Sequence, residues 1–418
     1  ATVAVIHQGR LDWSKAYGKA DVSSGEKVTT ETLFQCASIG KVITALAALK
    51  LVGAGEIDLD EPVNEKLKRW QIPENEFTQA KPVTLRHLLS HSAGLTDKHG
   101  FLGYKPGSQM PSLLQILNNQ APSNAERPIV VGRLPGTQEQ YSGGGYLIIQ
   151  LLIEDLSGQS FSDFVQQQVF EPLQMLHTTY DFQPDVNKNA QVARAHRTNG
   201  KVFKNKNYHL YPEHAAAGPW TTAKDLAKLL LAMQGGIKDD GLMLNPDLVK
   251  EMMSSQINHR GLGVNLRGID KPLAFWHSGQ NLGFTGLFYG LTETGDGAVI
   301  LLNSEGGDSL LQEFISSVAT VYDWPVMKQY QGLEITEAEK LALVGSYQSA
   351  DQSKSLTIAQ RDGRLYMNSA DSNSTLELFK IDQNRFSFQN AQDYYRLSFN
   401  YEGSQVKELL YQEGIGKA

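Results

Sequence analysis

The chain has 418 residues, 41% hydrophobic and 20% charged, which fits a globular protein long enough for two domains. Its formal net charge is −7 without a dense Lys/Arg run, which argues against nucleic acid or an anionic membrane as the main partner. The single cysteine, Cys36, excludes an intrachain disulfide and a metal site built from several cysteines. No apolar run reaches the roughly 18 residues that cross a bilayer.

In chain order, residues 1 to about 35 predict two strands with a turn near 8–10, followed by a polar loop. Helical patterns then follow at about 38–54, 84–90, 144–157, 161–169, 222–234 and 308–322. Strand patterns return between the last two of these, at 274–279, 283–291 and 297–303. Strands at both ends of this segment, with helices between them, predict one sheet that takes its edges from both ends.

The pattern changes after about residue 324. Residues 325–339 are typical of a linker, and the rest of the chain alternates in short strands with turn signals at 361–363 and 401–403. About eight strands in so short a segment predict a small antiparallel barrel. We therefore expect a first domain over 1–324, a linker over 325–339 and a barrel domain over 340–418.

The pair Ser38 and Lys41 opens the first long helical pattern, in the form S-x-x-K. Residues three apart share one face of a helix, and the helix N-terminus favours a developing oxyanion. A serine hydroxyl needs a base, and an amine withdrawn from water is a better base. A serine cap followed by a solvated lysine is the alternative, but the apolar run "ITALAALKLV" leaves Lys41 no obvious solvated face.

Two neighbouring patterns are weaker. Ser92 in "HLLSHSAGLT" is similar to a G-x-S-x-G nucleophile elbow, but Ser90 replaces the first glycine and the preceding segment is helical, so we reject it. His87 and His91 have a metal-binding spacing without the glutamate of H-E-x-x-H or an obvious third ligand. We expect capping or core roles for both histidines.

Two later patterns are uninformative alone, but they fit a catalytic site if they lie beside the serine and the lysine. Tyr141 precedes three glycines and an apolar helix, where it can pack as a hydrophobic staple or relay a proton. His277, Ser278 and Gly279 end a predicted strand in "FWHSGQNLGFTG". Alone, that triplet also fits a structural edge strand with an exposed histidine.

In this order, and with "EPLQML" and "AAGPWTTAKDLAKLLLAM", the motifs resemble the serine β-lactamase-like or penicillin-binding-protein family over about residues 1–324. That family includes class C β-lactamases, D,D-carboxypeptidases, D-aminopeptidases and family VIII esterases. The resemblance implies an α/β (α+β) fold, with an antiparallel sheet flanked by helices and an all-α region. The C-terminal barrel resembles the lipocalin-like domain of some peptidase members.

The resemblance also implies roles for individual residues. Ser38 matches the nucleophile that forms an acyl-enzyme, and Lys41 the general base or its electrostatic partner. Tyr141 matches the residue that shuttles a proton to or from the serine and the leaving group, and the sequence does not decide which of the two is the base. His277 matches the catalytic-site residue that opens the K-T-G-like triplet lining the site. The backbone N–H groups of Ser38 and Gln280 match an oxyanion hole, and the substrate-lining residues are Gly143, Ser278 and Gly279. No metal or organic cofactor is expected.

Two positions depart from the family pattern. The triplet that begins with Tyr141 usually ends in Asn, whose amide holds the substrate amide, but here it ends in Gly143. His277 stands where family members have Lys, His or Trp, and histidine in place of lysine removes a fixed positive charge. Both changes lower the expected turnover of β-lactams and fit an esterase, or a peptidase that holds its substrate through other contacts.

We therefore expect a serine hydrolase that acts through acyl-Ser38 on small esters or on D-amino-acid amides and peptides. The alternatives are a D-stereospecific carboxypeptidase or aminopeptidase, a weak β-lactamase, and a catalytically silent penicillin-recognising protein. The expected partner is a small-molecule or peptide acyl substrate. For a bacterial protein we expect a periplasmic or secreted location, with the cytoplasm as the alternative. The chain begins at its first strand, where family members often have a preceding helix, which indicates truncation.

Overall fold

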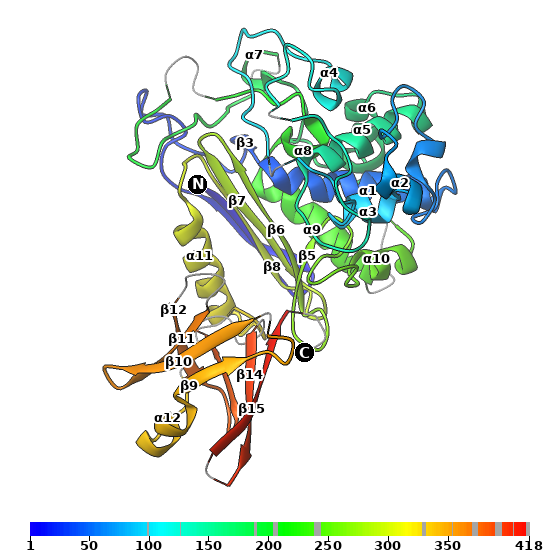
Figure 1. The fold of residues 1–418 in the computed structure, drawn as a ribbon. Coiled ribbons are helices and arrows are strands. Elements are labelled where there is room, and N and C mark those ends of the chain that lie inside the picture. The colour runs from blue at the N-terminus through cyan, green and yellow to red at the C-terminus, as the bar shows by residue number, and fades with distance from the viewer. Residues whose placement is uncertain are drawn as a thin grey trace. The chain divides into compact units, whose positions relative to one another are not determined.

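The computed structural model describes most of the chain (Figure 1). The described residues are 1–97, 100–125, 127–187, 190–203, 208–237, 244–327, 332–352, 354–369, 375–388, 395–403 and 405–414. Internal contacts divide the chain into two units. The first unit comprises 1–266 and 274–313, and the second comprises 267–273 and 314–418.

The first unit is built on a six-stranded sheet in the order β2-β1-β8-β7-β6-β5. The N-terminal hairpin joins this sheet through β1, which pairs antiparallel with β8. Strands from both ends of the unit thus form one sheet, as predicted. Its strands are β1 (Thr2–His7), β2 (Arg10–Ala16), β5 (Asn265–Arg267), β6 (Ala274–Asn281), β7 (Phe284–Leu291) and β8 (Gly297–Leu302), and a separate pair is formed by β3 (Phe34–Gln35) and β4 (Trp220–Thr221).

Helix α1 (Gly40–Gly53) is the central helix of the first unit, which explains why its sequence is apolar almost all round. Every residue of α1 except Lys50, Val52 and Gly53 is buried, and the helix packs against α5, α6 and α8. Figure 1 shows α1, α5 and α6 gathered in one group beside the sheet. The prediction of a helix over 38–54 is therefore confirmed for most of this range, but a separate 3₁₀ turn at Ala37–Ile39 precedes α1.

The helices predicted over 84–90, 144–157, 222–234 and 308–322 correspond closely to α3, α5, α9 and α11, whereas α2, α4, α7, α8, α10 and α12 were not predicted. The segment predicted as one helix over 161–169 is α6 followed by a π-helical turn at Gln166–Phe170. The bounds are α2 Glu76–Ala80, α3 Leu85–Leu89, α4 Leu113–Leu117, α5 Gly143–Ser157, α6 Phe161–Val165, α7 Pro184–Asn187, α8 His214–Ala217, α9 Ala223–Ile237, α10 Pro246–Met252, α11 Asp308–Val321 and α12 Glu337–Leu343, with a 3₁₀ turn at Val63–Glu65. No helix in the described ranges is long and apolar enough to cross a membrane.

The second unit holds a seven-stranded antiparallel sheet in which each strand pairs with the next along the chain, giving a nearly closed barrel. Its interior is filled by apolar side chains such as Ile358, Phe386 and Phe399. The strands are β9 Gly345–Gln348, β10 Ser355–Arg361, β11 Arg364–Ser369, β12 Thr375–Lys380, β13 Arg385–Phe388, β14 Tyr395–Glu402 and β15 Gln405–Glu413. The predicted fold class is confirmed, with seven strands among the described residues instead of about eight. The domain boundaries at 324 and 340 stay a prediction.

Candidate active site

Ser38 lies in the 3₁₀ turn between β3 and α1, where the chain bends sharply. Ala37, directly before it, has a φ of 50°, a left-handed conformation that costs energy for a residue with a Cβ. Strand β6 packs against this turn so closely that a Cβ on Gly279 would collide with the carbonyl oxygen of Cys36. Gly279, expected to line the substrate site, is thus required for the close approach of two backbone segments.

Lys41 is 1% exposed and reaches Ser38 across one turn, as the S-x-x-K spacing predicts. Its Nζ lies 3.2 Å from Ser38 Oγ and donates to the carbonyl oxygen of Ala216 at 2.7 Å. The same helix, α8, also accepts at Ala215 a hydrogen bond from Thr44, one turn further along α1. These bonds hold α8 against α1 and aim the lysine amine at the serine hydroxyl.

Tyr141 is brought to this pair from the loop that enters α5. Lys41 Nζ lies 5.0 Å from the centre of its ring. The next residue, Ser142, caps α5 by accepting from the backbone N–H of Gly145 at 2.8 Å and donates to Asp97 Oδ1 at 2.6 Å. The capped helix start holds the tyrosine beside Lys41, which itself contacts Ser38, so three predicted site residues from two distant segments come together.

His91 holds the tyrosine loop in place. Its backbone carbonyl accepts from Gln140 N–H at 2.8 Å and its Nδ1 from Ser142 N–H at 3.1 Å, so it binds both neighbours of Tyr141. Its ring centre lies 4.3 Å from that of Tyr141. Burial lowers the pKa of His91 well below the usual value, and the charges of Arg260 and Lys41 add to the effect, which keeps the ring neutral. The sequence suggested a capping or core role and did not reveal this contact.

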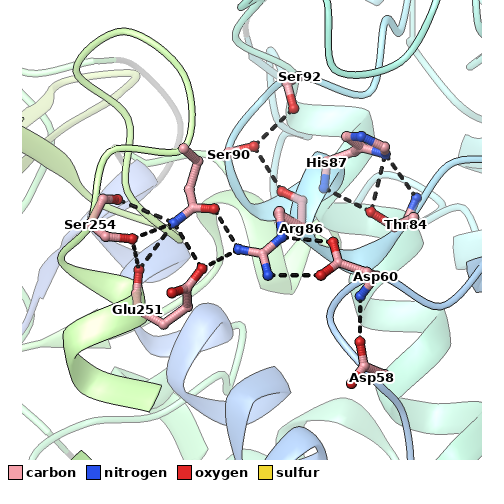
Figure 2. A network of polar contacts seen from close by, with 10 residues as sticks. Asp58, Asp60, Thr84, Arg86, His87, Ser90, Ser92, Glu251 and Ser254 are labelled. Atoms are coloured by element: carbon pink, nitrogen blue, oxygen red, sulfur yellow. Dashed lines mark hydrogen bonds and ion pairs between the residues drawn. The ribbon is translucent and has the colours of Figure 1, made fainter. Parts of the chain in front are cut away.

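His87 and Ser92 have structural surroundings. His87 Nδ1 accepts from the Thr84 backbone N–H at 3.2 Å in a capping box at the start of α3, which confirms the expected capping role. Ser92 shares a hydrogen bond of 2.9 Å with Ser90, which donates to the Arg86 carbonyl (Figure 2). Ser92 also follows a helix, which supports its rejection as a nucleophile. Among the described residues no group of three or more His, Cys, Asp or Glu could hold a metal ion.

His277 in β6 faces the same site as a neutral ring. Its Nδ1 lies 2.6 Å from the carbonyl oxygen of Ser278, which can only accept, so Nδ1 carries the hydrogen and Nε2 is an acceptor. Nε2 is buried and has no hydrogen-bond partner within the described residues. Burial lowers the pKa of His277 to about 3, helped by the charge of Lys41. Its ring centre lies 6.3 Å from that of Tyr141.

The other expected site residues lie on the same two segments. Gly143 is the first residue of α5, and Ser278 and Gln280 are exposed on β6. The oxyanion hole formed by the N–H groups of Ser38 and Gln280, and the substrate-lining roles of Gly143 and Ser278, stay predictions.

Arg260 is a site residue that the sequence analysis missed. Its guanidinium carbon lies 5.6 Å from the ring centre of Tyr141, and its Nε donates to Glu139 Oε1 at 2.7 Å. Arg260 comes from the loop after α10, far from the other site residues in sequence. No motif in "NHRGLGVNL" marks this arginine, because its position depends on tertiary packing alone.

Comparison with known families agrees with this geometry. The model of the Beta-lactamase family matches residues 1–315. The chain belongs to the Beta-lactamase family. Among curated relatives, the teichoic acid D-alanine hydrolase of Staphylococcus aureus is 28% identical over 234 residues, which cover 56% of this chain and 54% of that protein. The chain thus matches about half the length of this relative.

Solved structures share the fold. A penicillin-binding protein homologue from Pyrococcus abyssi, described as octameric, superposes with a TM-score of 0.60 at 21% identity, covering 98% of this chain and 94% of the other. The D-amino acid amidase from Ochrobactrum anthropi SV3 superposes with a TM-score of 0.57 at 22% identity, covering 72% and 86%. The family resemblance predicted from the motifs is confirmed.

Proposed function

We propose that the chain is a serine hydrolase that forms an acyl-enzyme on Ser38 with small esters or amides of D-amino acids. The observation that carries the proposal is the 3.2 Å contact between Ser38 Oγ and the buried Lys41 Nζ, with Tyr141 beside it. Family membership supports the reaction type. The D-alanine hydrolase and the D-amino acid amidase support the substrate class.

The proposed reaction has two halves. Lys41 or Tyr141 takes the proton of Ser38, whose Oγ attacks the acyl carbonyl, and the backbone N–H groups of Ser38 and of Gln280 on β6 stabilise the oxyanion. The proton then passes to the leaving alcohol or amine as its bond to the acyl carbon breaks. In the second half, water takes the place of Ser38 as the attacking group: it gives up a proton, attacks the acyl carbonyl of the acyl-enzyme, and the bond between the acyl carbon and Ser38 Oγ breaks. This step releases the acid and the free serine.

A rate comparison tests the proposal and selects between esters and amides. We would measure turnover of p-nitrophenyl acetate, D-alanine p-nitroanilide and L-alanine p-nitroanilide by wild type and by Ser38→Ala. We expect turnover that is lost in the variant, with the D-anilide preferred over the L-anilide. Ester turnover alone would restrict the enzyme to esters. No Ser38-dependent turnover of any of the three substrates would overturn the proposal and favour a silent binding protein.

A further inference from the structure

Arg260 places a fixed positive charge beside Tyr141 at a site where the sequence suggested that one was lost. His277 is neutral, so the position where many family members have lysine supplies no charge. The guanidinium of Arg260 instead stands over the ring of Tyr141, with its Cζ 5.6 Å from the ring centre. Lys41 Nζ lies 5.0 Å from the same centre. Tyr141 is therefore flanked by two cations from different segments.

Arg260 also joins the two segments that carry Tyr141 and His277. On one side its Nε donates to Glu139, two residues before Tyr141, at 2.7 Å. On the other side its Nη1 donates to Asn265 Oδ1. The Asn265 amide then donates to the carbonyl of Trp276, next to His277, at 3.3 Å. The guanidinium is thus a bridge between the tyrosine loop and β6.

The loop that presents Arg260 is itself held in place. Arg260 N–H donates to Ile257 at 2.9 Å, and its carbonyl accepts from Gln256 N–H at 2.8 Å. The side chain of Gln256 accepts from Arg86 at 2.6 Å. Figure 2 shows Arg86 between Asp60 and Glu251, which anchors this loop to the α3 region. The arginine is therefore presented by a supported loop.

We propose that Arg260 is a positioning residue whose charge favours the proton-accepting state of the Lys41–Tyr141 pair, an inference that rests on the proposed hydrolase function. A fixed cation disfavours a second protonated cation beside it and favours an oxyanion. Either choice of base, lysine or tyrosine, gives the same direction. Among the described residues, the titratable and charged groups around Tyr141 include Lys41 on α1, His91 after α3, Asp97 and Glu139 on neighbouring loops, Tyr146 on α5, Arg260 after α10 and His277 on β6.

Two variants of one ion pair separate charge from structure. Arg260→Gln removes the cation, whereas Glu139→Gln removes the carboxylate that partly neutralises it, so both abolish the same ion pair. We would record the pH dependence of kcat/KM for p-nitrophenyl acetate with each. The acidic limb is expected to move up by about 0.5 to 1 pH unit in Arg260→Gln and down in Glu139→Gln. Arg260→Lys should keep a limb close to that of wild type.

The competing account is that Arg260 only ties two segments together. In that case both glutamine variants would lower kcat/KM with the acidic limb unmoved or moved in the same direction, and the proposal would be overturned. Failure of the hydrolase proposal has a different signature, since wild type itself would then show no Ser38-dependent turnover. A thermal melt of each variant identifies loss of fold, and the downward shift of the acidic limb in Glu139→Gln still tests the effect of the charge if Arg260→Gln does not fold.

Discussion

Lys41 and Arg86 are two cations of the first unit in opposite surroundings. Lys41 is 1% exposed, and its amine contacts only neutral oxygens in the hydrogen bonds described, those of Ser38 and Ala216. Arg86 keeps 26% of its side chain exposed and pairs with the carboxylates of two other segments. Lys41 is therefore buried beside a hydroxyl, whereas Arg86 forms ion pairs near the surface that link separate segments.

The partners decide what each cation can do. The hydrogen bonds that Arg86 donates to Asp60 raise the pKa of Arg86, and Glu251 adds to the effect, so its charge is permanent and its role is to hold segments together (Figure 2). A lysine whose partners are neutral oxygens can exchange a proton with a neighbouring hydroxyl. On the proposed function we expect a catalytic role for Lys41 and a stabilising role for Arg86, and variants of each residue can separate the two effects.

Lys41→Met should have the largest effect on activity. We expect kcat/KM for p-nitrophenyl acetate to fall by about 10³-fold or more, because Ser38 loses the amine that is either its base or the electrostatic partner of that base. The thermal midpoint should not fall below that of wild type, since a buried amine is replaced by an apolar side chain of similar length. If Lys41→Met kept more than a tenth of the wild-type activity, Lys41 would not have the catalytic role that sets it apart from Arg86.

Glu213 extends the comparison to a buried carboxyl group, and Glu213→Gln replaces this ionisable group with a neutral amide of the same size. Glu213 is fully buried beside α8, and neither carboxylate oxygen has a hydrogen-bond partner in the described ranges. Burial raises the pKa of Glu213 from 4.5 to about 8. The folded state then keeps a proton that the unfolded state releases between these values, so stability falls as pH rises through this window.

The expected result is that Glu213→Gln removes this slope. The substitution should stabilise the folded state more at pH 8 than at pH 5, by about 3 to 4 kcal/mol in the free energy of unfolding. Urea unfolding at the two pH values measures the difference. An equal effect of the substitution at both pH values would show that Glu213 is not held protonated.

Arg86→Met should cost stability with little effect on turnover. The substitution leaves the Asp60 and Glu251 carboxylates without their shared cation, and we expect a loss of about 1 to 2 kcal/mol because the pairs are partly exposed. Urea unfolding gives the loss, and kcat/KM should stay within a few-fold of wild type. A hundredfold drop in turnover with unchanged stability would reverse the roles of the two cations.

His277→Lys tests the smallest predicted effect, on substrate choice. A lysine would add a fixed charge able to bind a substrate carboxylate, so the ratio of kcat/KM for a chromogenic cephalosporin to that for p-nitrophenyl acetate should rise about tenfold. Wild type should turn the cephalosporin over slowly. Rapid cephalosporin turnover by wild type would instead favour the β-lactamase alternative.

Local patterns predicted much of the fold and part of the site. The spacing of Ser38 and Lys41 was readable because one helical turn sets their distance, and the apolar sequence of α1 matched its central position. The strands at both ends of the first unit were readable from their alternation. Tyr141 and His277 were singled out through the order of motifs, since their separate patterns also fitted structural roles.

The missed features depend on tertiary structure. His91 acts through contacts to both neighbours of Tyr141, and its own sequence pattern suggested only a cap or core role. Arg260 reaches the site from a loop without a motif. The neutral state of His277 follows from burial beside Lys41, which no spacing rule encodes.

The most direct test of the account is covalent labelling of wild type and Lys41→Met with a fluorophosphonate, followed by peptide mass mapping. A fluorophosphonate loses fluoride as it bonds to an activated serine oxygen, so the adduct identifies the nucleophile. The account predicts rapid labelling of wild type on Ser38 alone and at least a hundredfold slower labelling of Lys41→Met. An adduct on another serine such as Ser92, or equal rates in the two proteins, would contradict it.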